Sequence, residues 1–358
     1  MKMTFRWYGS TMDIIPLRYI KQIPNMSGVV TTLMDLPAGA LWPVERIRAL
    51  KEEVNSAGLE MEVIESVNIH EDIKLGLHSR DAYIENYCKT IERLGQAGVK
   101  VICYNFMPVF DWTRSDLFKS RSDGATVLAY DQKRIDQIAD PQAFADQIQN
   151  GAGEFEMAGW ESERMGELKT LFTRYRHVSH DDLLEHLSYF LKAVIPTCEQ
   201  YDVKMAIHQD DPPWDIFGLP RICTGREDIR RILNLVDSPY NGLTLCSGSL
   251  GANICNDIPA LVREFGVEGR IHFAHVRNIR FTGERQFEES AHFSEDGSLD
   301  LYEIMKAYYD VGFTGYVRPD HGRMIWDEKG RAGYGLYDRA LGASYLNGLW
   351  EAICKNGL

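Results

Sequence analysis

The chain has 358 residues, of which 44% are hydrophobic and 25% are charged, and its formal net charge is −13. This composition is typical of a globular protein and excludes an intrinsically disordered chain. The negative charge argues against nucleic acid or an anionic membrane as a partner. A small anionic substrate stays open, because a few arginines inside a pocket outweigh a distant acidic surface.

The sequence carries no targeting or disulfide pattern. No stretch approaches the roughly 20 consecutive apolar residues of a transmembrane helix. The opening MKMTFRWYGS lacks the apolar region of a signal peptide, so we expect a cytoplasmic protein. The seven cysteines are scattered without CxxC spacing. Any functional cysteine is therefore expected to be a metal ligand or a nucleophile, not half of a disulfide.

Short β-rich runs alternate with helical patterns along the chain. The expected strands are residues 4–8, 28–33, 59–66, 99–106, 203–210, 241–248, 271–278 and 315–322. The expected helices are residues 43–57, 79–97, 181–201, 226–236, 257–265, 299–311 and 337–354. The first two helices end just before Gly58 and Gly98, a usual stop signal. Eight strands alternating with helices predict an α/β fold, a single (β/α)8 TIM-barrel domain over residues 1–358.

One interval between strands is far longer than the others. The gap between the fourth and fifth strands greatly exceeds the roughly 30 residues of a βα unit, and the excess lies at residues 107–180. TIM barrels place their active sites on the loops that follow the strands. The insertion is therefore expected on the functional face, where it forms either a lid over the site or a subunit contact. The sequence does not decide between these two roles.

The last four predicted strands each end in a residue that can bind a metal ion. These residues are His208, Cys246, His275 and Asp320. Side chains at the C-terminal ends of barrel strands converge on one site. A lone histidine is more often structural, but four consecutive strands that each supply a ligand are hard to produce by chance. Two imidazoles, a thiolate and a carboxylate suit a divalent transition-metal ion, so the sequence predicts a metal site.

Side-chain alternation along the strands brings polar groups to the same site. Because successive side chains point to opposite faces, Arg277 shares the inward face of His275, while His272 faces outward. Arg318 likewise shares the face of Asp320. The inward set therefore combines metal ligands with two guanidinium groups, which bind carboxylates in a bidentate manner.

We predict that a substrate carboxylate meets these polar groups. The residues predicted to bind substrate are Arg277, Arg318, Arg323 and Asp210. Asp210 is included because it shares the inward face of His208 on the fifth strand. The alternative for Arg277 or Arg318 is a structural ion pair with Asp210 or Asp211, and the sequence leaves both open.

Several stretches resemble the mannonate dehydratase family. They are FRWYG at the start, HQDDPPWDIFGLPRI at 208–222, TLCSGSLGA at 244–252, HFAHVRN at 272–278 and YVRPDHGR at 316–323. The resemblance covers essentially the whole chain, including the insertion. It implies a xylose-isomerase-like barrel and a metal-dependent lyase of hexuronate breakdown. It also implies that Mn²⁺ or Fe²⁺ is bound by the four predicted ligands.

The same resemblance implies catalytic roles for His321 and for a downstream tyrosine, Tyr334, with Tyr337 as a competing candidate. Dehydrating D-mannonate to 2-dehydro-3-deoxy-D-gluconate removes the C2 proton and the C3 hydroxyl, so that a base and an acid are needed. The sequence leaves open which residue takes which role. Our assignment gives His321 the leaving hydroxyl and Tyr334 the proton.

The adjacency of Asp320 and His321 raises a geometric difficulty. On a regular strand the two side chains face opposite ways and cannot both reach the substrate. Either the strand ends at residues 319–320 and the backbone turns, or His321 supports the site from behind. Gly322 makes the turn plausible.

Two other classes of function stay open at this point. One is a sugar isomerase or epimerase on the same kind of barrel, which usually binds its metal through several carboxylates; the thiolate argues against it. The other is a non-catalytic metal-binding protein, for which a closed four-ligand shell would be typical. For the lyase we expect D-mannonate as the substrate and a homo-oligomer, first of all a dimer.

Overall fold

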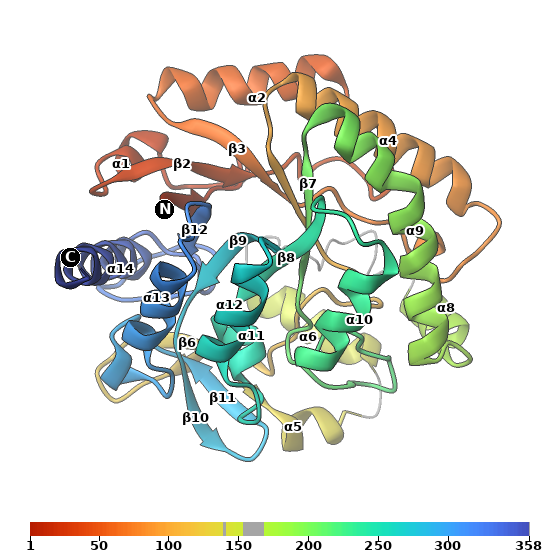
Figure 1. Cartoon of the computed structure of the whole chain (residues 1–358). Helices are drawn as coiled ribbons and strands as arrows, with labels where there is room; N and C mark the ends of the chain where they lie inside the picture. The colour runs from red at the N-terminus through yellow and green to blue at the C-terminus, as the bar shows by residue number, and fades with distance from the viewer. Residues whose placement is uncertain (139–140, 153–167, 358) are drawn as a thin grey trace.

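The computed structural model describes residues 1–138, 141–152 and 168–357. Eight parallel strands form a closed barrel in the order β1-β12-β9-β8-β7-β4-β3-β2, and helices surround it (Figure 1). The strands are β1 (Lys2–Arg6), β2 (Met26–Thr31), β3 (Glu60–Glu65), β4 (Val101–Tyr104), β7 (Lys204–His208), β8 (Asn241–Cys246), β9 (Ile271–Val276) and β12 (Tyr316–Pro319). Every predicted barrel strand is present, so the predicted TIM barrel is confirmed.

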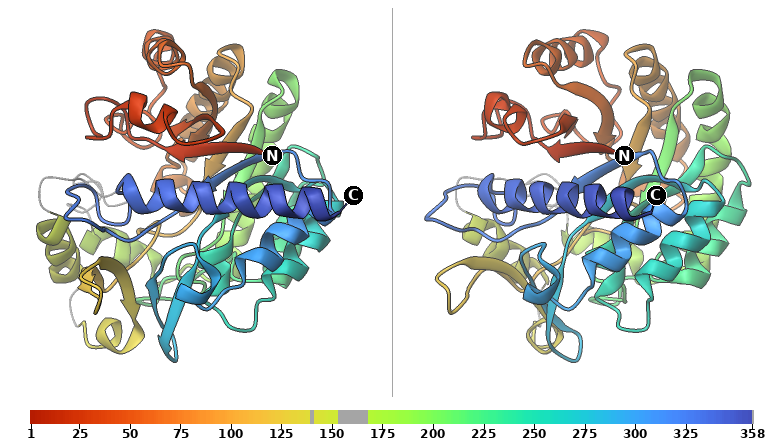
Figure 2. Two further views of the ribbon diagram at one scale, coloured as in Figure 1. Left: turned by 90° about the vertical axis from the view of Figure 1, so that its left-hand side faces the viewer. Right: turned by 60° about the vertical axis from the view of Figure 1, so that its left-hand side comes forward.

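The predicted helices cover the outside of the barrel. They are α2 (Val44–Ser56), α4 (Arg80–Gln96), α9 (His180–Tyr201), α10 (Arg226–Leu235), α12 (Ile258–Val267), α13 (Leu301–Asp310) and α14 (Tyr337–Asn356), the last of which lies along the side of the barrel (Figure 2). After α2 and α4 the chain turns at Gly58 and Gly98, with φ of 72° and 87°. Only glycine adopts these values without steric strain, which is why both helices end there.

Apolar side chains fill the barrel and the layer around it. One cluster of buried residues comes from six different barrel strands, which can meet only in the barrel interior: Val30, Val63, Val101, Cys103, Ala206, Phe273 and Tyr316. A larger cluster packs the outer faces of the strands against the helices. Because Phe273 points inward, His275 two residues later points inward as well. The ring centroids of Phe273 and His275 are 4.5 Å apart.

A second sheet, which the sequence did not predict, joins the insertion to the loop after β9. Its order is β10-β11-β6-β5, with antiparallel pairing throughout. The insertion supplies β5 (Asp116–Ser120) and β6 (Thr126–Asp131), while β10 (Ile279–Gly283) and β11 (Gln286–Glu289) form a hairpin after β9. Figure 1 shows the hairpin and the insertion on the same side of the barrel. The insertion is thus anchored to a segment about 150 residues further along the chain.

Shorter elements complete the described structure. The insertion adds α5 (Gln132–Asp136), α6 (Pro141–Ala152) and α8 (Leu168–Tyr175), and elsewhere lie α1 (Leu17–Lys21), α3 (Glu71–Lys74), α11 (Ser247–Gly251) and the 3₁₀ helix η1 (Ser294–Asp296). Part of the predicted insertion, residues 139–140 and 153–167, lies outside the described residues. Among the helices that are described, none is long and apolar enough to cross a membrane.

Candidate functional site

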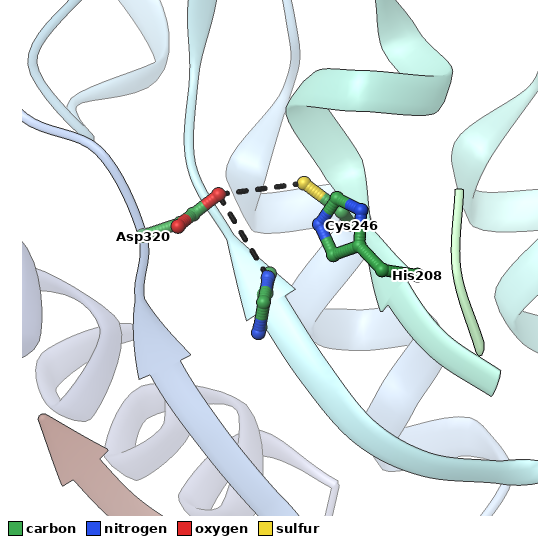
Figure 3. Close-up of side chains that lie close together, drawn as sticks. His208, Cys246 and Asp320 are labelled. Carbon is green, nitrogen blue, oxygen red and sulfur yellow. Dashed lines mark hydrogen bonds and ion pairs between the residues drawn. The ribbon is translucent and has the colours of Figure 1, made fainter. Parts of the chain in front are cut away.

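The structure brings the four predicted metal ligands together at the C-terminal end of the barrel. His208 ends β7, Cys246 ends β8, His275 lies next to the end of β9, and Asp320 follows β12 directly. Each offers one ligand atom, and these atoms lie within 4.8 Å of one another. Figure 3 shows the side chains of His208, Cys246 and Asp320 pointing toward a common point.

Strand register explains this convergence. Cys246 on β8 pairs with His275 on β9, and His275 in turn pairs with Arg318 on β12. Side chains in register on adjacent parallel strands point the same way, here into the barrel mouth. Asp320 Oδ2 then lies 3.5 Å from Cys246 Sγ and 3.9 Å from His275 Nδ1.

Electrostatics keep two of the four groups negatively charged. Burial raises the pKa of the Cys246 thiol, but the Arg277 guanidinium and the hydrogen bonds with His208 and His275 together outweigh burial and hold this pKa well below the usual range. Burial likewise opposes ionisation of Asp320, yet Arg318 and its neighbours hold the pKa of that carboxyl well below its usual value. The N–H and the hydroxyl of Ser249 also donate to Cys246 Sγ, at 3.4 and 3.1 Å. A thiolate and a carboxylate are therefore available as ligands.

The negative charge of Cys246 also affects the pKa of His208. Burial lowers the pKa of this histidine, but its hydrogen bond to Cys246 and the thiolate charge outweigh burial and raise the pKa to about 9. Two imidazoles, a thiolate and a carboxylate in one buried cluster fit a divalent transition-metal ion, which would replace the proton in neutralising the site.

Two buried arginines flank the cluster on the inward face, as the strand pattern predicted. Arg277 Nε lies 2.9 Å from Asp320 Oδ2, and Arg318 Nη2 lies 2.9 Å from Asp320 Oδ1. Arg277 also pairs with Asp211 at 2.7 Å, which is the structural ion pair held open as the alternative for this residue. Arg318 pairs with Glu65 at the end of β3, again at 2.9 Å. Both guanidinium groups thus contribute to holding the carboxylates of the site.

His321 reaches the same site because β12 ends at Pro319 and the backbone then turns. Its Nε2 lies 2.8 Å from Tyr334 Oη and 3.8 Å from Asp320 Oδ1. Both His321 and Tyr334 are buried, whereas the competing Tyr337 is 42% exposed at the start of α14. The arrangement is a cluster of four side chains that could hold a metal ion, with an imidazole and a phenol in hydrogen-bond contact beside it.

Comparison with known proteins identifies the family of this chain. The family model for D-mannonate dehydratase (UxuA) matches residues 1–357. The chain belongs to this family. It is a carbon–oxygen hydro-lyase that converts D-mannonate to 2-dehydro-3-deoxy-D-gluconate in hexuronate catabolism. Family membership thus favours the lyase over the isomerase and the non-catalytic alternatives.

Individual relatives agree with the family match. The chain is 59% identical to the mannonate dehydratase of Thermotoga maritima, over 99% of this chain and 98% of that protein. It is 57% identical to that of Geobacillus thermodenitrificans, over 99% and 95%. Among solved structures, mannonate dehydratase from Streptococcus suis serotype 2 superposes with a TM-score of 0.90 at 47% identity, covering 100% of this chain and 96% of that one.

More distant structures share only the barrel with this dehydratase. A xylose isomerase domain protein from Planctomyces limnophilus superposes with a TM-score of 0.56 at 11% identity, over 99% of this chain and 98% of that one. Such low identity supports the xylose-isomerase-like fold and carries no information about the reaction.

Two residues predicted to bind substrate are engaged with neighbouring loops in this family member. Asp210 accepts a hydrogen bond from the Cys223 backbone N–H at 2.7 Å and lies 3.6 Å from Arg221. Arg323 pairs with Asp338 at 2.8 Å. These contacts favour structural roles, and substrate binding by either residue stays a prediction.

Further residues surround the site that the sequence did not predict, among them Glu65, Trp112, Arg114 and Glu289. Glu65 lies 3.3 Å from His275 Nε2, and Trp112 packs against His321 with ring centroids 5.9 Å apart. Arg114 and Glu289 pair with each other at 2.9 Å beneath His321. A carboxylate at the end of a barrel strand could have drawn attention to Glu65. Glu289 gave no such signal, because it lies on the unpredicted hairpin.

A short helix follows Cys246 directly. Residues Ser247–Gly251 form α11, and the Cys246 side chain caps its first turn. A Cβ on Gly248 would lie 2.5 Å from Arg277 Nε. Glycine is therefore required at this position so that the Arg277 side chain can pass.

Proposed function

We propose that this enzyme dehydrates D-mannonate with a divalent metal ion, Mn²⁺ or Fe²⁺, held by the imidazoles of His208 and His275, the thiolate of Cys246 and the carboxylate of Asp320. The observation that carries this proposal is the buried cluster of four donor atoms within 4.8 Å. When bound, such an ion supplies a Lewis acid that stabilises negative charge on the substrate oxygens. The remaining chemistry falls to the side chains around it.

Proton transfer is assigned to the pair His321 and Tyr334, whose Nε2 and Oη atoms are 2.8 Å apart. Burial and the nearby Tyr8 hold the pKa of Tyr334 well above its usual value, so that the phenol keeps its proton. A protonated phenol suits the acid and an imidazole suits the base. We therefore assign the C2 proton to His321 and the leaving hydroxyl to Tyr334, which is the reverse of the assignment made from sequence.

These roles balance the reaction. The C2–H bond breaks and its proton passes to His321, while the C3–O bond breaks and the hydroxyl leaves as water with the proton of Tyr334. The resulting C2=C3 enol tautomerises to the 2-keto product. Transfer of the proton from His321 back to Tyr334 across the 2.8 Å hydrogen bond restores both residues.

Binding of the sugar acid is assigned to donors that the protein leaves unused. Among the described residues, Arg318 Nη1 and Tyr8 Oη are buried and have no hydrogen-bond partner. Leaving a buried donor unsatisfied costs about 1–3 kcal/mol, which a substrate oxygen would offset. Tyr8 packs edge-on against Tyr334, with ring centroids 5.3 Å apart, which places this donor beside the acid–base pair.

The insertion is proposed to wall off the site rather than to serve only as a subunit contact. Trp112 contacts the ring of His321, and Arg114 pairs with Asp211 at 2.7 Å and with Glu289 at 2.9 Å. These residues precede β5, so the start of the insertion lies against the acid–base pair. A homodimer stays a prediction from sequence, and light scattering would show twice the 40.9 kDa of one chain.

The metal assignment is tested by removing and restoring the ion. Chelation should abolish the formation of 2-dehydro-3-deoxy-D-gluconate from D-mannonate, and addition of Mn²⁺ or Fe²⁺ should restore it. Metal content measured on the same samples should rise from near zero to one ion per chain as activity returns. Full activity in the metal-free enzyme would overturn the assignment.

A further inference from the structure

We propose that Glu289 is a positioning residue for the dehydration: its carboxylate sets which ring nitrogen of His321 carries the hydrogen, and so leaves Nε2 facing Tyr334 as the proton acceptor. The proposal rests on the acid–base role of His321 proposed above. Glu289 is the last residue of β11, is fully buried, and comes from the second sheet rather than from the barrel.

The contacts of Glu289 place one carboxylate oxygen against three donors. Glu289 Oε1 lies 3.2 Å from His321 Nδ1 and 2.9 Å from Arg114 Nη2, and it also forms an ion pair with Arg277 Nη1. The two guanidinium groups approach from the insertion and from the end of β9. They hold the carboxylate against Nδ1 of His321.

The charge of Glu289 decides the direction of the hydrogen bonds. Burial raises the pKa of its carboxyl, but Arg277, His321 and Arg114 together outweigh burial and lower this pKa to about 2. An ionised carboxylate has no hydrogen to donate, so His321 Nδ1 must donate to it. To act as the proposed base, His321 must be neutral, and a neutral imidazole carries a hydrogen on one nitrogen only. With that hydrogen on Nδ1, Nε2 is the acceptor. The Tyr334 hydroxyl, 2.8 Å away, then donates to Nε2.

Glu289, His321 and Tyr334 are thus linked by two hydrogen bonds. Tyr334 donates to His321, and His321 donates to Glu289. A carboxylate that holds an imidazole in one tautomer is a general device of acid–base catalysis, and in serine proteases loss of the correct tautomer lowers kcat by about 10⁴. Here the carboxylate reaches the site only through the second sheet.

The insertion also helps to position Glu289, through its strand in the second sheet. Phe287 and Glu288 on β11 pair with Tyr130 and Ala129 on β6, so the insertion strand fixes the hairpin that carries Glu289. Arg114 adds a direct contact from the insertion. The loops after β4 and β9 therefore act together to orient a residue that follows β12.

Two variants of Glu289 separate positioning from simple charge pairing. Glu289→Gln loses the charge but keeps the side-chain length, and Arg114 and Arg277 would hold its amide oxygen in the Oε1 position, where it still accepts from His321 Nδ1. Glu289→Asp keeps the charge but withdraws the acceptor oxygen from His321. Positioning predicts that Glu289→Asp loses about 10²-fold or more in kcat, with KM and metal content nearly unchanged, and that Glu289→Gln retains at least about 10-fold more activity than Glu289→Asp. A purely structural ion pair predicts the opposite order, which would overturn the proposal.

The neighbouring Glu288 supplies the matched control. It lies on the same strand and pairs with Lys119 at 2.7 Å, away from His321. Glu288→Asp and Glu288→Gln are expected to leave kcat unchanged. If they lowered kcat as much as the Glu289 variants do, the effect would come from the hairpin as a whole and the proposal would fail.

A spectroscopic readout tests the tautomer without measuring activity. Nitrogen-15 spectra of the histidine rings in the enzyme loaded with diamagnetic Zn²⁺ should show hydrogen on Nδ1 of His321 in the wild type, with the signal assigned by its absence from His321→Gln. Glu289→Asp should shift hydrogen to Nε2, and an unchanged spectrum would overturn the proposal. If His321→Gln kept full kcat, the proposed acid–base role itself would fail; if only Glu289→Asp kept it, the positioning role alone would fail.

Discussion

Asp320 and His321 are neighbours in the chain, and yet both side chains enter the same buried site, where Asp320 Oδ1 and His321 Nε2 are 3.8 Å apart. A regular strand would send them to opposite faces. They share the site because β12 ends at Pro319 and the backbone turns before Gly322. The turn places a proposed metal ligand, Asp320, directly beside a proposed proton-transfer group, His321. Only a variant that affects one of the two residues can therefore separate metal binding from proton transfer.

Replacing the thiolate should change which metals the enzyme prefers. Cys246→Ser removes the softest ligand of the cluster, so that affinity for Zn²⁺ and Fe²⁺ should fall more than affinity for Mn²⁺, by roughly 10-fold or more. Metal competition followed by elemental analysis measures this preference. Cys255→Ser is the control, because Cys255 is exposed and outside the cluster. Unchanged metal content and preference in Cys246→Ser would show that Cys246 only packs the core.

Loss of the phenol should abolish acid catalysis. Tyr334→Phe should lower kcat by about 10²–10⁴ with little change in KM, as expected for a residue that acts in the transition state. Tyr337→Phe serves as the control and should behave as wild type, because Tyr337 is exposed and Tyr334 contacts His321.

The leaving group distinguishes the two proton roles. In a 3-deoxy-3-fluoro analogue of D-mannonate, the leaving group is fluoride, which depends less on protonation by an acid than hydroxide does. Tyr334→Phe should therefore regain much of its rate on this analogue, while His321→Gln should not. The reverse pattern would restore the assignment made from sequence.

Replacing Trp112 should lower the rate of dehydration more than replacing an exposed tryptophan. Its ring packs edge-on against His321, so Trp112→Ala should loosen the imidazole and lower kcat/KM by roughly 10-fold. Trp326 is 69% exposed, and Trp326→Ala should have no effect on the rate. Equal rates for wild type and Trp112→Ala would argue that the insertion does not wall the site.

The buried Glu289 should make stability depend on pH. Burial raises the pKa of its carboxyl, but Arg277, His321 and Arg114 together outweigh burial, so the pKa is about 2 in the folded state against 4.5 for the free group. The stabilisation is therefore complete above about pH 4.5 and is lost as the pH falls toward 2. Glu289→Gln should lower the melting temperature markedly at pH 7 and much less at pH 3. Calorimetry that gave the same difference at both pH values would contradict this.

The barrel could be predicted from sequence because each element carries its own local signal. Strands such as β4 are continuous apolar runs, and α2 and α4 end at glycines that adopt positive φ. The β10–β11 hairpin had no such signal, because its two strands are short and β11 pairs with β6, far away in the sequence. Local patterns do not encode pairing of this kind.

The site could be predicted only in part, for the same physical reason. His208, Cys246 and His275 stand at strand ends, so strand alternation alone places them together. Glu289 and Arg114 reach His321 through the second sheet, and no periodicity in the sequence links them to it. The burial that raises the pKa of Tyr334 and indicates its acid role is likewise a property of the folded site.

The central claim, that His321 transfers a proton rather than supporting the metal ligand Asp320, is tested most directly on His321→Gln. Metal content and kcat are measured together on this one variant at saturating Mn²⁺. The account predicts normal metal content and a kcat lower by about 10²–10⁴ that excess Mn²⁺ does not restore. A metal affinity lower by about 10–100-fold, with the rate restored by excess Mn²⁺, would contradict it and assign His321 to the support of Asp320.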